Sequence, residues 1–346
     1  MSEEAEVLFE RRGAAGIITL NRPKALNALT LGMVRAIHPQ LIVWGDDPKI
    51  QCVVIEAAGD RAFCAGGDIR ALYDWGRAGD PTALDFWREE YKLNTYIKRY
   101  RKPYVALMDG INMGGGVGVS VHGSHRVATE KLTFAMPETG IGLFPDVGGT
   151  YFLPRCPGDT GMYLGLTGTR LKAADAIYAG IADTYVPSVR LETLKDRLAG
   201  GTDPRVAFRE VAEEEGPAPL ASMQKEISAH FSKDSVGDVI TSLRTDGGEW
   251  ATKTADTIEA KSPTSTLVAF RQIREGAALD FEECMKLEYR LIERFVKGHD
   301  FYEGVRAAVI DKDQAPKWKP AMLAEMNAGD VDEYFAPLGA GELTLP

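Results

Sequence analysis

The amino-acid sequence predicts an α/β fold with parallel strands, followed by a helical region. Short apolar runs alternate with segments of helical periodicity over the first part of the chain, as expected where helices connect parallel strands. Two of these runs lead into a glycine-rich turn and then a helix start. After about residue 195 strand-like runs almost vanish. We therefore predict a core over residues 1–195 and a helical region over residues 196–346 that packs on the core.

The elements of the predicted core follow one another in a regular order. Residues 7–10 and 16–20 are predicted to form a hairpin, turned at residues 12–15. No internal repeat is strong enough to define the fold by itself. The remaining elements are predicted as a helix over 31–44, a strand around 53, a helix over 68–77, a helix over 84–100, a strand around 105, a helix-like segment over 117–122, and strands over 126–129 and 132–135.

The second part of the chain is predicted to be helical. Breaks with turn chemistry at 200–204 and 213–219 separate its segments. One helix has clear end signals: Ser262 suits the N-cap, Pro263 the first helical position and Gly276 the C-terminal cap. The predicted helices cover residues 235–243, 250–260, 263–275 and 280–296.

The segment from Met136 to Gly149 carries the strongest functional signal. It places Glu138 and Asp146 eight positions apart among apolar residues and glycines. A carboxylate in apolar surroundings is costly unless it is paired or used. Two of them are the usual equipment for acid/base or nucleophilic catalysis. The alternative is a loop whose acids cap helices or face solvent.

Two glycine-rich turns lie upstream, at residues 61–68 and 110–118. Each follows a strand-like run and precedes a helix start, with Asp68 as a suitable N-cap in the first. Such a turn can aim backbone N–H groups at an anion, and two turns giving one N–H each make a simple oxyanion hole. Phosphate binding or tight glycine packing is the alternative. The spacing fits neither the dinucleotide fingerprint nor the P-loop.

Together these motifs resemble the crotonase (enoyl-CoA hydratase/isomerase) superfamily over most of residues 5–195. The resemblance implies a β/α spiral of repeated turns with C-terminal helices. It also implies that the backbone N–H groups of Gly67 and Gly115 hold the oxygen of a CoA thioester. The segments that carry it are residues 21–27, 63–68, 114–118, 137–138 and 145–149.

Within the superfamily the chain is most similar to hydrolases of short-chain 3-hydroxyacyl-CoA thioesters. This similarity implies an acyl-CoA thioester hydrolase, with 3-hydroxyisobutyryl-CoA as the expected substrate and a place in valine degradation. The segments that carry it are residues 88–91, 113–118, 134–138, 142–146 and 298–307.

One departure decides between hydration and hydrolysis. Hydratases of the resembled superfamily have a Glu where this chain has Gly118, and usually a Gly where it has Asp146. Hydration needs two acid/base groups to place water across a double bond, and one of them is missing here. Keeping the thioester-oxygen hole while gaining a carboxylate favours attack on the thioester carbonyl.

We therefore expect a catalytic set of Gly67, Gly115, Glu138 and Asp146. The two amides polarise the carbonyl and stabilise the oxyanion. Glu138 acts as a nucleophile or as the base for a water, and Asp146 orients the substrate hydroxyl or shares the proton transfers. Glu90 matches a substrate-contacting position of the resembled family and is expected to bind substrate. An isomerase that uses Glu138 as its one base, or a CoA-thioester binder without turnover, stays an alternative.

The charge of the chain limits its partners. A formal net charge of −10 argues against nucleic acid or an anionic membrane surface. An anionic CoA then needs local basic residues, and Arg22 and Lys24, beside Ala25, are expected near CoA because the resembled family uses this loop there. Solvated surface charge is the alternative. CoA enters as part of the substrate, no other cofactor is expected, and a homo-oligomer stays open.

The sequence gives no sign of a membrane span or a targeting segment. No apolar run reaches the roughly 20 residues that a membrane span needs. Residues 1–6 are acidic and lack the basic character of a secretory signal or a mitochondrial presequence. These features predict a cytoplasmic protein.

Other reactive side chains are expected to be structural. The four cysteines show no CxxC spacing, and Cys64 is favoured as a buried thiol over a nucleophile. His122 and His125 could share a helix face, but no matching ligand spacing supports a metal site. Ser120 is not in a nucleophile elbow. The set Asp300, Glu303 and Arg306 could lie near the substrate, with surface salt bridging as the favoured alternative.

Overall fold

The computed structural model describes residues 5–345 and contains two sheets. The larger sheet has the strand order β1-β2-β3-β5-β7-β9 and the smaller one β4-β6-β8. β1 and β2 pair antiparallel, and the other neighbours pair parallel. The strands are β1 (Val7–Arg12), β2 (Ala15–Leu20), β3 (Cys52–Ala57), β4 (Ala62–Cys64), β5 (Tyr104–Met108), β6 (Ile111–Met113), β7 (His125–Ala128), β8 (Thr133–Ala135) and β9 (Thr184–Tyr185).

Each of three successive turns of the chain places one strand in the larger sheet and the next strand in the smaller sheet. β3, β5 and β7 are neighbours in the larger sheet, and β4, β6 and β8, which follow them in sequence, are neighbours in the smaller one. This is a β/α spiral, and the predicted fold class is confirmed. The turns differ in length, which is why no fixed sequence period marks them. The first turn contains α2 (Ile69–Ala78) and α3 (Thr82–Lys98), whereas the second contains only α4 (Gly115–Gly118).

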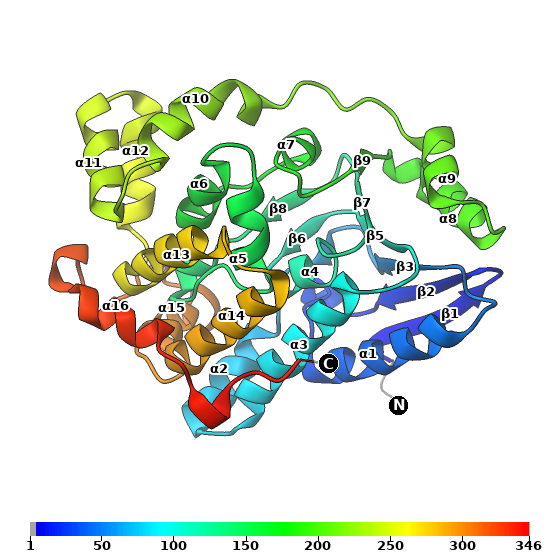
Figure 1. Cartoon of the computed structure of the whole chain (residues 1–346), viewed down its shortest axis with the longest axis horizontal. Helices are drawn as coiled ribbons and strands as arrows, with labels where there is room; N and C mark the ends of the chain where they lie inside the picture. Colours follow the sequence, from blue (N-terminus) through cyan, green and yellow to red (C-terminus); the bar gives the residue numbers. More distant parts are fainter. Residues whose placement is uncertain (1–4, 346) are drawn as a thin grey trace.

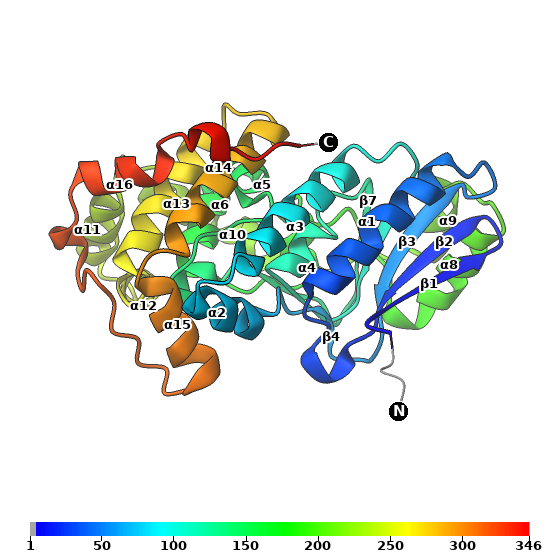
Figure 2. The same cartoon turned by 90° about the horizontal axis from the view of Figure 1, so that it is seen from below.

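The larger sheet is covered on both faces (Figures 1 and 2). On one face Ile18 and Ile55 belong to the cluster that includes α1 (Leu31–Asp46) and α3. On the other, Ile17 and Val54 belong to the cluster that includes α8 (Leu191–Ala199) and α9 (Pro204–Val211). Alternate residues of each strand are therefore buried on opposite sides. The division predicted at residue 195 falls inside α8 and stays a prediction.

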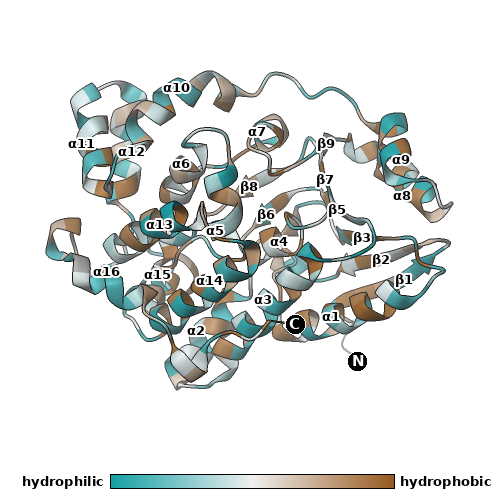
Figure 3. Ribbon diagram, viewed as in Figure 1, coloured by the Kyte–Doolittle hydropathy of each residue, from teal (hydrophilic) through white to brown (hydrophobic). Residues whose placement is uncertain are grey.

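The described residues beyond 195 form helices and no strand. An extended connection leads from α9 to α10, and the following helices gather at the end of the molecule away from β1 and β2 (Figure 1). They carry both apolar and polar residues, as expected of elements with one buried face (Figure 3). These helices are α10 (Pro219–Phe231), α11 (Val236–Asp246), α12 (Glu249–Glu259), α13 (Pro263–Gly276), α14 (Phe281–Phe295), α15 (Asp300–Val305) and α16 (Ala328–Phe335).

The ends of α13 follow the sequence signals with one difference. The Ser262 hydroxyl accepts the N–H of Ser265, and Pro263 is the first helical residue, as predicted. Gly276 is the last helical residue, and Ala277 is the C-cap. A side chain at Gly276 would overlap the carbonyl of Thr150, so the glycine permits close packing.

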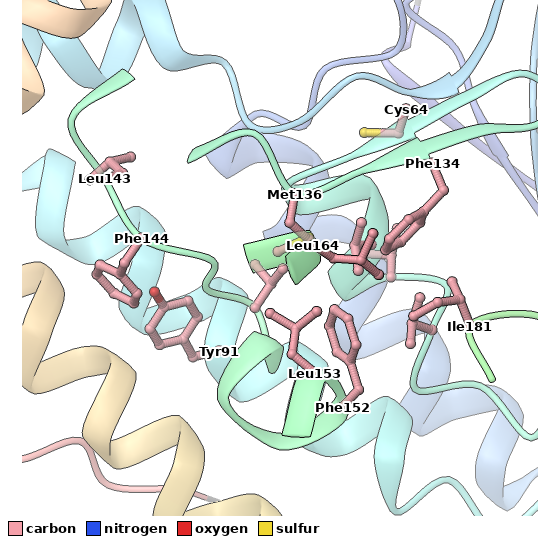
Figure 4. Packing of buried hydrophobic residues seen from close by; sticks show 14 of the residues in the cluster. Cys64, Tyr91, Phe134, Met136, Leu143, Phe144, Phe152, Leu153, Leu164 and Ile181 are labelled. Carbon is pink, nitrogen blue, oxygen red and sulfur yellow. The ribbon is translucent and has the colours of Figure 1, made fainter. Parts of the chain in front are cut away.

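Three short helices lie between the two regions: α5 (Gly149–Phe152), α6 (Thr160–Thr167) and α7 (Ala173–Tyr178). Their apolar side chains join the main core. Phe134 and Phe152 meet edge to face, with ring centroids 6.4 Å apart, and Met136, Leu153 and Leu164 belong to the same cluster (Figure 4). This packing supports the chain on both sides of the acidic segment. Within residues 5–345, no helix has the length and hydrophobicity that a membrane crossing requires.

Candidate active site

The two predicted amide donors lie on adjacent loops. Gly67 precedes α2, and Gly115 opens α4. The Leu29 N–H donates to the Gly66 carbonyl, and the Leu29 carbonyl accepts the N–H of Asp68. These bonds hold the two peptide groups that flank the Gly67 α-carbon. Neither the Gly67 nor the Gly115 N–H donates to another group among the described residues. A Cβ added to Gly115 would lie 3.2 Å from the Gly67 nitrogen, so the two loops almost touch.

A cavity of 230 Å³ opens beside these amides. Its lining includes Gly67, Gly115, Glu90, Glu138 and Asp146. The structure therefore brings together the four predicted catalytic residues and one predicted substrate contact. The rest of the wall is largely apolar, formed by Ala65, Gly66, Ile69, Leu72, Phe86, Trp87, Met113, Gly114, Pro137, Ile141, Leu143 and Val309.

Glu138 begins a short 3-10 turn, η2 (Glu138–Ile141), just after β8. Its side chain is buried, and its Oε2 has no hydrogen-bond partner within the described chain. A Cβ on Gly114 would lie 3.5 Å from its Oε1, which places the carboxyl beside the second amide loop. Burial, with the nearby charge of Asp146, raises the pKa of Glu138 well above its usual range. Glu138 is thus a buried acid facing the cavity, with one carboxyl oxygen free of hydrogen bonds within the described chain.

Two glycines dock the η2 turn onto the C-terminal region. Gly142 has φ +73° and passes so close to Asp300 that a side chain would overlap the Asp300 carbonyl. Gly304, on α15, lies equally close to the backbone of Ile141. The segment after η2 and the helix α15 therefore lie backbone to backbone, and this contact supports Glu138.

Asp146 is held by two aromatic side chains of α3. The Tyr91 hydroxyl donates to Asp146 Oδ2 at 2.8 Å, and Trp87 donates a further hydrogen bond. Burial raises the pKa of Asp146 to about 6, although these hydrogen bonds oppose the rise. Its carboxyl therefore changes charge near neutral pH.

Glu90 completes a group of carboxyls around the cavity. It is buried, and its Oε1 has no partner in the described part of the chain. That oxygen lies 2.6 Å from where a Cβ on Gly115 would be, directly beside an amide donor. Burial, then the charges of Asp146 and Glu288, raise the pKa of Glu90 well above its usual range. Several acids in so small a space cannot all ionise independently.

The position of the missing hydratase acid is filled. A Cβ on Gly118 would lie 2.7 Å from Asn94 Nδ2 and 3.0 Å from Val147 Cβ. Asn94 is fully buried. An acidic side chain could not occupy this space without displacing both neighbours. The site therefore lacks the second acid of a hydratase, and it also lacks the space for one.

The predicted CoA-binding loop lies outside the 230 Å³ cavity. Pro23, Lys24 and Ala25 form a 3-10 turn. Arg22 pairs with Glu6 at 2.9 Å and Asp68 at 3.0 Å, and it lines a neighbouring groove of 430 Å³ that shares Phe86 with the cavity. Lys24 is exposed. The roles of Arg22, Lys24 and Ala25 with CoA stay predictions.

The remaining reactive side chains have other partners. The Cys64 thiol is buried, contacts the Gly66 carbonyl, and has its pKa raised by burial to about 12, so it is not a ready nucleophile. Ser120 donates to the Gly116 carbonyl. Glu303 and Arg306 form an ion pair at 2.8 Å, as the favoured interpretation expected. Asp300 differs from that interpretation, because it is buried and accepts a hydrogen bond from the Ser262 hydroxyl.

The predicted helix over residues 117–122 is wrong. α4 ends at Gly118, so His122 and His125 do not share a helix face. His122 Nε2 lies 2.6 Å from the Val147 carbonyl, and His125 packs against Phe208. No group of three candidate metal ligands occurs among residues 5–345.

Sequence reasoning missed two contributors to the cavity, Trp87 and Val309. Trp87, which bonds Asp146, shares one face of α3 with Glu90, Tyr91 and Asn94, and this i, i+3, i+4, i+7 spacing was the signal available. Val309 comes from a π-helical turn, η5 (Arg306–Ile310), after α15. Nothing in its sequence neighbourhood points to a cavity, because its place depends on the packing of distant segments.

A β/α spiral with paired amides beside buried carboxyls defines a crotonase-type site. A family model described as enoyl-CoA hydratase/isomerase matches residues 15–335. The chain therefore belongs to the enoyl-CoA hydratase/isomerase family.

Similar proteins with curated names are 3-hydroxyisobutyryl-CoA hydrolases. Those of Xenopus tropicalis and Danio rerio are each 51% identical to this chain, over 99% and 100% of it and 92% and 94% of their own lengths. The human protein is 48% identical over 98% of this chain and 90% of its own length.

Similar proteins with solved structures are named for other reactions than hydrolysis. A carnitinyl-CoA dehydratase from Mycobacterium thermoresistibile is 42% identical, with a TM-score of 0.95 and 99% of both chains covered. An enoyl-CoA hydratase from Rhodobacter sphaeroides is 41% identical, with a TM-score of 0.91 over 99% of this chain and 100% of its own. These similarities agree on the family and differ on the reaction.

The predicted cytoplasmic location is contradicted by the three curated relatives described above, which are named as mitochondrial. The prediction depended on the charge of residues 1–6, which is a weak guide to compartment. Residues 1–4 of that segment lie outside the described residues.

Proposed function

We propose that this protein hydrolyses 3-hydroxyisobutyryl-CoA to 3-hydroxyisobutyrate and CoA, the thioesterase step that the family resemblance assigns to valine degradation. One observation carries the proposal: two unused amides and two buried carboxyls line one cavity, while Asn94 and Val147 fill the hydratase acid position. The curated relatives support the same reaction by their names.

The amides of Gly67 and Gly115 would hold the thioester oxygen and stabilise the negative charge that forms on it. Removing one such donor typically raises the barrier by about 2.7–4 kcal/mol. The donors need no rearrangement, because they have no other partners among the described residues. In the proposed hydrolysis, attack is on the carbonyl carbon that this hydrogen bonding polarises.

Glu138 has two possible roles in this scheme. As a nucleophile, its carboxylate oxygen bonds to the acyl carbon, the C–S bond breaks, and CoA leaves as a thiolate that takes a proton. Water then cleaves the mixed anhydride. As a base, it takes a proton from water, which attacks the acyl carbon directly. Asp146 would orient the hydroxyl of the acyl group or share the proton transfers.

Trapping separates the two routes. Hydroxylamine added during turnover would attack either carbonyl of an anhydride at Glu138, and attack on the Glu138 side leaves a hydroxamate, visible as a mass change in the peptide that contains Glu138. The same peptide from enzyme without substrate is the control. Absence of this adduct, together with no acyl hydroxamate in solution beyond the enzyme-free rate, would favour the base route.

The proposed activity is tested by following two products separately. Purified protein is incubated with 3-hydroxyisobutyryl-CoA and with crotonyl-CoA, while free thiol and loss of unsaturation are recorded. We expect thiol release from the first and no hydration of the second. Hydration of crotonyl-CoA without thiol release from either substrate would overturn the proposal in favour of the activities named for the solved relatives.

The scheme uses no metal or redox cofactor, and CoA takes part only as the leaving group. Prior dialysis against a chelator should therefore leave the rate of thiol release unchanged. A loss of rate that a divalent ion restores would require a different mechanism.

A further inference from the structure

The loop that carries Asp146 adopts an unfavourable backbone conformation. Val147 has φ +49°, and Gly148 has φ +93°. A β-branched residue rarely adopts a positive φ, so surrounding contacts must impose it. The loop lies between Asp146, which faces the cavity, and α5, which begins at Gly149. Its conformation therefore determines where the Asp146 carboxyl points.

A single carboxylate from α14 holds the far side of this loop. Glu288 Oε2 accepts the N–H of Gly148 at 2.8 Å, and its Oε1 accepts the N–H of Thr150 at 2.9 Å. Both oxygens are thus used on N–H groups of the loop, one on each side of Gly149. Glu288 lies 140 positions after Gly148 in the sequence.

Two further side chains complete the support. His122 contacts the Val147 carbonyl, and the Gln272 amide donates to the Pro145 carbonyl. Glu288 is the acceptor for the N–H groups of Gly148 and Thr150, while the N–H of Gly149 donates to the Asp146 carbonyl. Replacing it by glutamine would keep the shape but provide one acceptor and one donor, so one loop N–H would face another N–H.

The burial of Glu288 indicates more than space filling. Its side chain is fully buried, and within residues 5–345 no Lys or Arg forms an ion pair with it. A buried carboxylate without a cation is costly unless hydrogen bonds satisfy it. Here backbone amides of the Asp146 loop offset part of that cost, and burial still raises the pKa of Glu288 to about 8. The cost of burying this acid is thus tied to the geometry of the site.

We propose that Glu288 is a positioning residue that fixes the backbone of residues 147–150 and thereby aims the Asp146 carboxyl at the acyl group. The proposal rests on the proposed function for its kinetic consequence. Its structural consequence, an ordered loop that depends on two acceptor oxygens, can be measured without activity.

The experiment compares Glu288→Gln, Glu288→Asp and the control Glu283→Gln in the full chain. Glu283 lies on the same helix, exposed and paired with Lys286. A misplacement of about 1 Å can lower a rate about 100-fold, so we expect Glu288→Gln to lower kcat about 10- to 100-fold while KM changes less than threefold. The control should match the wild type.

Two readouts separate positioning from general stability. If the acceptors matter, Glu288→Asp keeps both oxygens and retains more kcat than the isosteric Glu288→Gln; a space-filling role predicts the reverse order. Hydrogen exchange should quicken in the peptide over residues 145–152 of Glu288→Gln and stay unchanged in the peptide that covers Gly67.

The outcomes are distinct. A kcat for Glu288→Gln within twofold of wild type, or faster exchange throughout the chain without a local change, would overturn the proposal. If Glu288→Gln fails to fold, hydrogen exchange in Glu288→Asp decides instead: faster exchange spread over the whole chain, with no local change over residues 145–152, would overturn the proposal. If the wild type itself releases no thiol, the proposed function fails, while the exchange comparison still decides whether Glu288 fixes the loop.

Discussion

The two halves of the candidate site are built by different means. The amide half, at Gly67 and Gly115, is set by backbone bonds between neighbouring strands and loops of the spiral. The acid half, at Glu138 and Asp146, depends on α3 and on segments far away in the sequence, including Asp300. The amide half uses no ionisable group. The acid half buries several carboxyls and raises their pKa values.

This difference separates stability from function. Backbone amides cost little to bury when strand pairing already orders them, whereas an unpaired buried acid opposes folding. We therefore expect changes in the amide half to reduce activity without a gain in stability. Changes that remove an acid should reduce activity and increase stability.

The largest expected effect is that of Glu138→Gln. Removing the nucleophile or base should lower kcat for thiol release by about 10³-fold or more. The melting temperature should rise or stay the same, because a buried unpaired carboxyl is replaced by a neutral group of equal size. Thiol release and calorimetry measure the two effects. A variant with near-normal turnover would show that the acid half is not the reacting half.

Gly115→Ala tests the amide half. The new methyl group would lie 2.6 Å from Glu90 Oε1 and 3.2 Å from the Gly67 nitrogen, so it would crowd both an acid and the partner amide. We expect kcat to fall about 10²- to 10³-fold, as when one oxyanion donor is lost, with no rise in melting temperature. Gly237→Ala is the matched control, because the nearest atom to its new methyl is 3.7 Å away. Equal kcat for the two variants would contradict the role of the amide pair.

The pH dependence of stability should distinguish the halves next. The pKa of Asp146 is raised from 3.8 to about 6 in the folded protein, so the fold binds its proton more tightly than the unfolded chain does. Stability from this group is therefore present at low pH and is lost as the pH rises from about 4 to about 6. This shift corresponds to about 3 kcal/mol at most.

Asp146→Asn removes that loss. Its advantage in unfolding free energy over the wild type should be small near pH 4, grow between pH 4 and pH 6, and then level off. Urea unfolding at several pH values measures it. An advantage that shrinks over this interval would mean that the ionised form of Asp146 is stabilised in the fold.

The same contrast explains what the sequence could predict. The strand–glycine–helix units, the N-caps at Asp68 and Ser262, and the lack of an acid at Gly118 all follow from residues close together in the chain, and the structure has them. The spiral class was implied by the family resemblance that these motifs carry, and it is confirmed. The bonds that set the amide half are likewise made between segments that local motifs mark.

The acid half contains features that no local pattern reveals. The filling of the Gly118 position depends on Asn94, from another helix, and the wall at Val309 depends on the docking of α15 and the turn after it. The helix over 117–122 was overextended because its glycines and apolar residues continue past Gly118. Tertiary contacts decided each of these, and their partners are far apart in the sequence.

Gly304→Ala should have the smallest of the predicted effects and bears on how the acid half is supported. The new methyl group would overlap the Ile141 backbone, so α15 must move away from the turn that carries Glu138. Overpacking of this kind typically costs about 1–3 kcal/mol, and we expect a matching loss of unfolding free energy with a kcat lowered about threefold to tenfold. Gly216→Ala, where nothing lies within 4 Å of the added methyl, is the control. If Gly304→Ala lowered stability but left kcat unchanged, α15 would stabilise the fold without placing Glu138. Support of the acid half by distant segments would then be confined to Asp146.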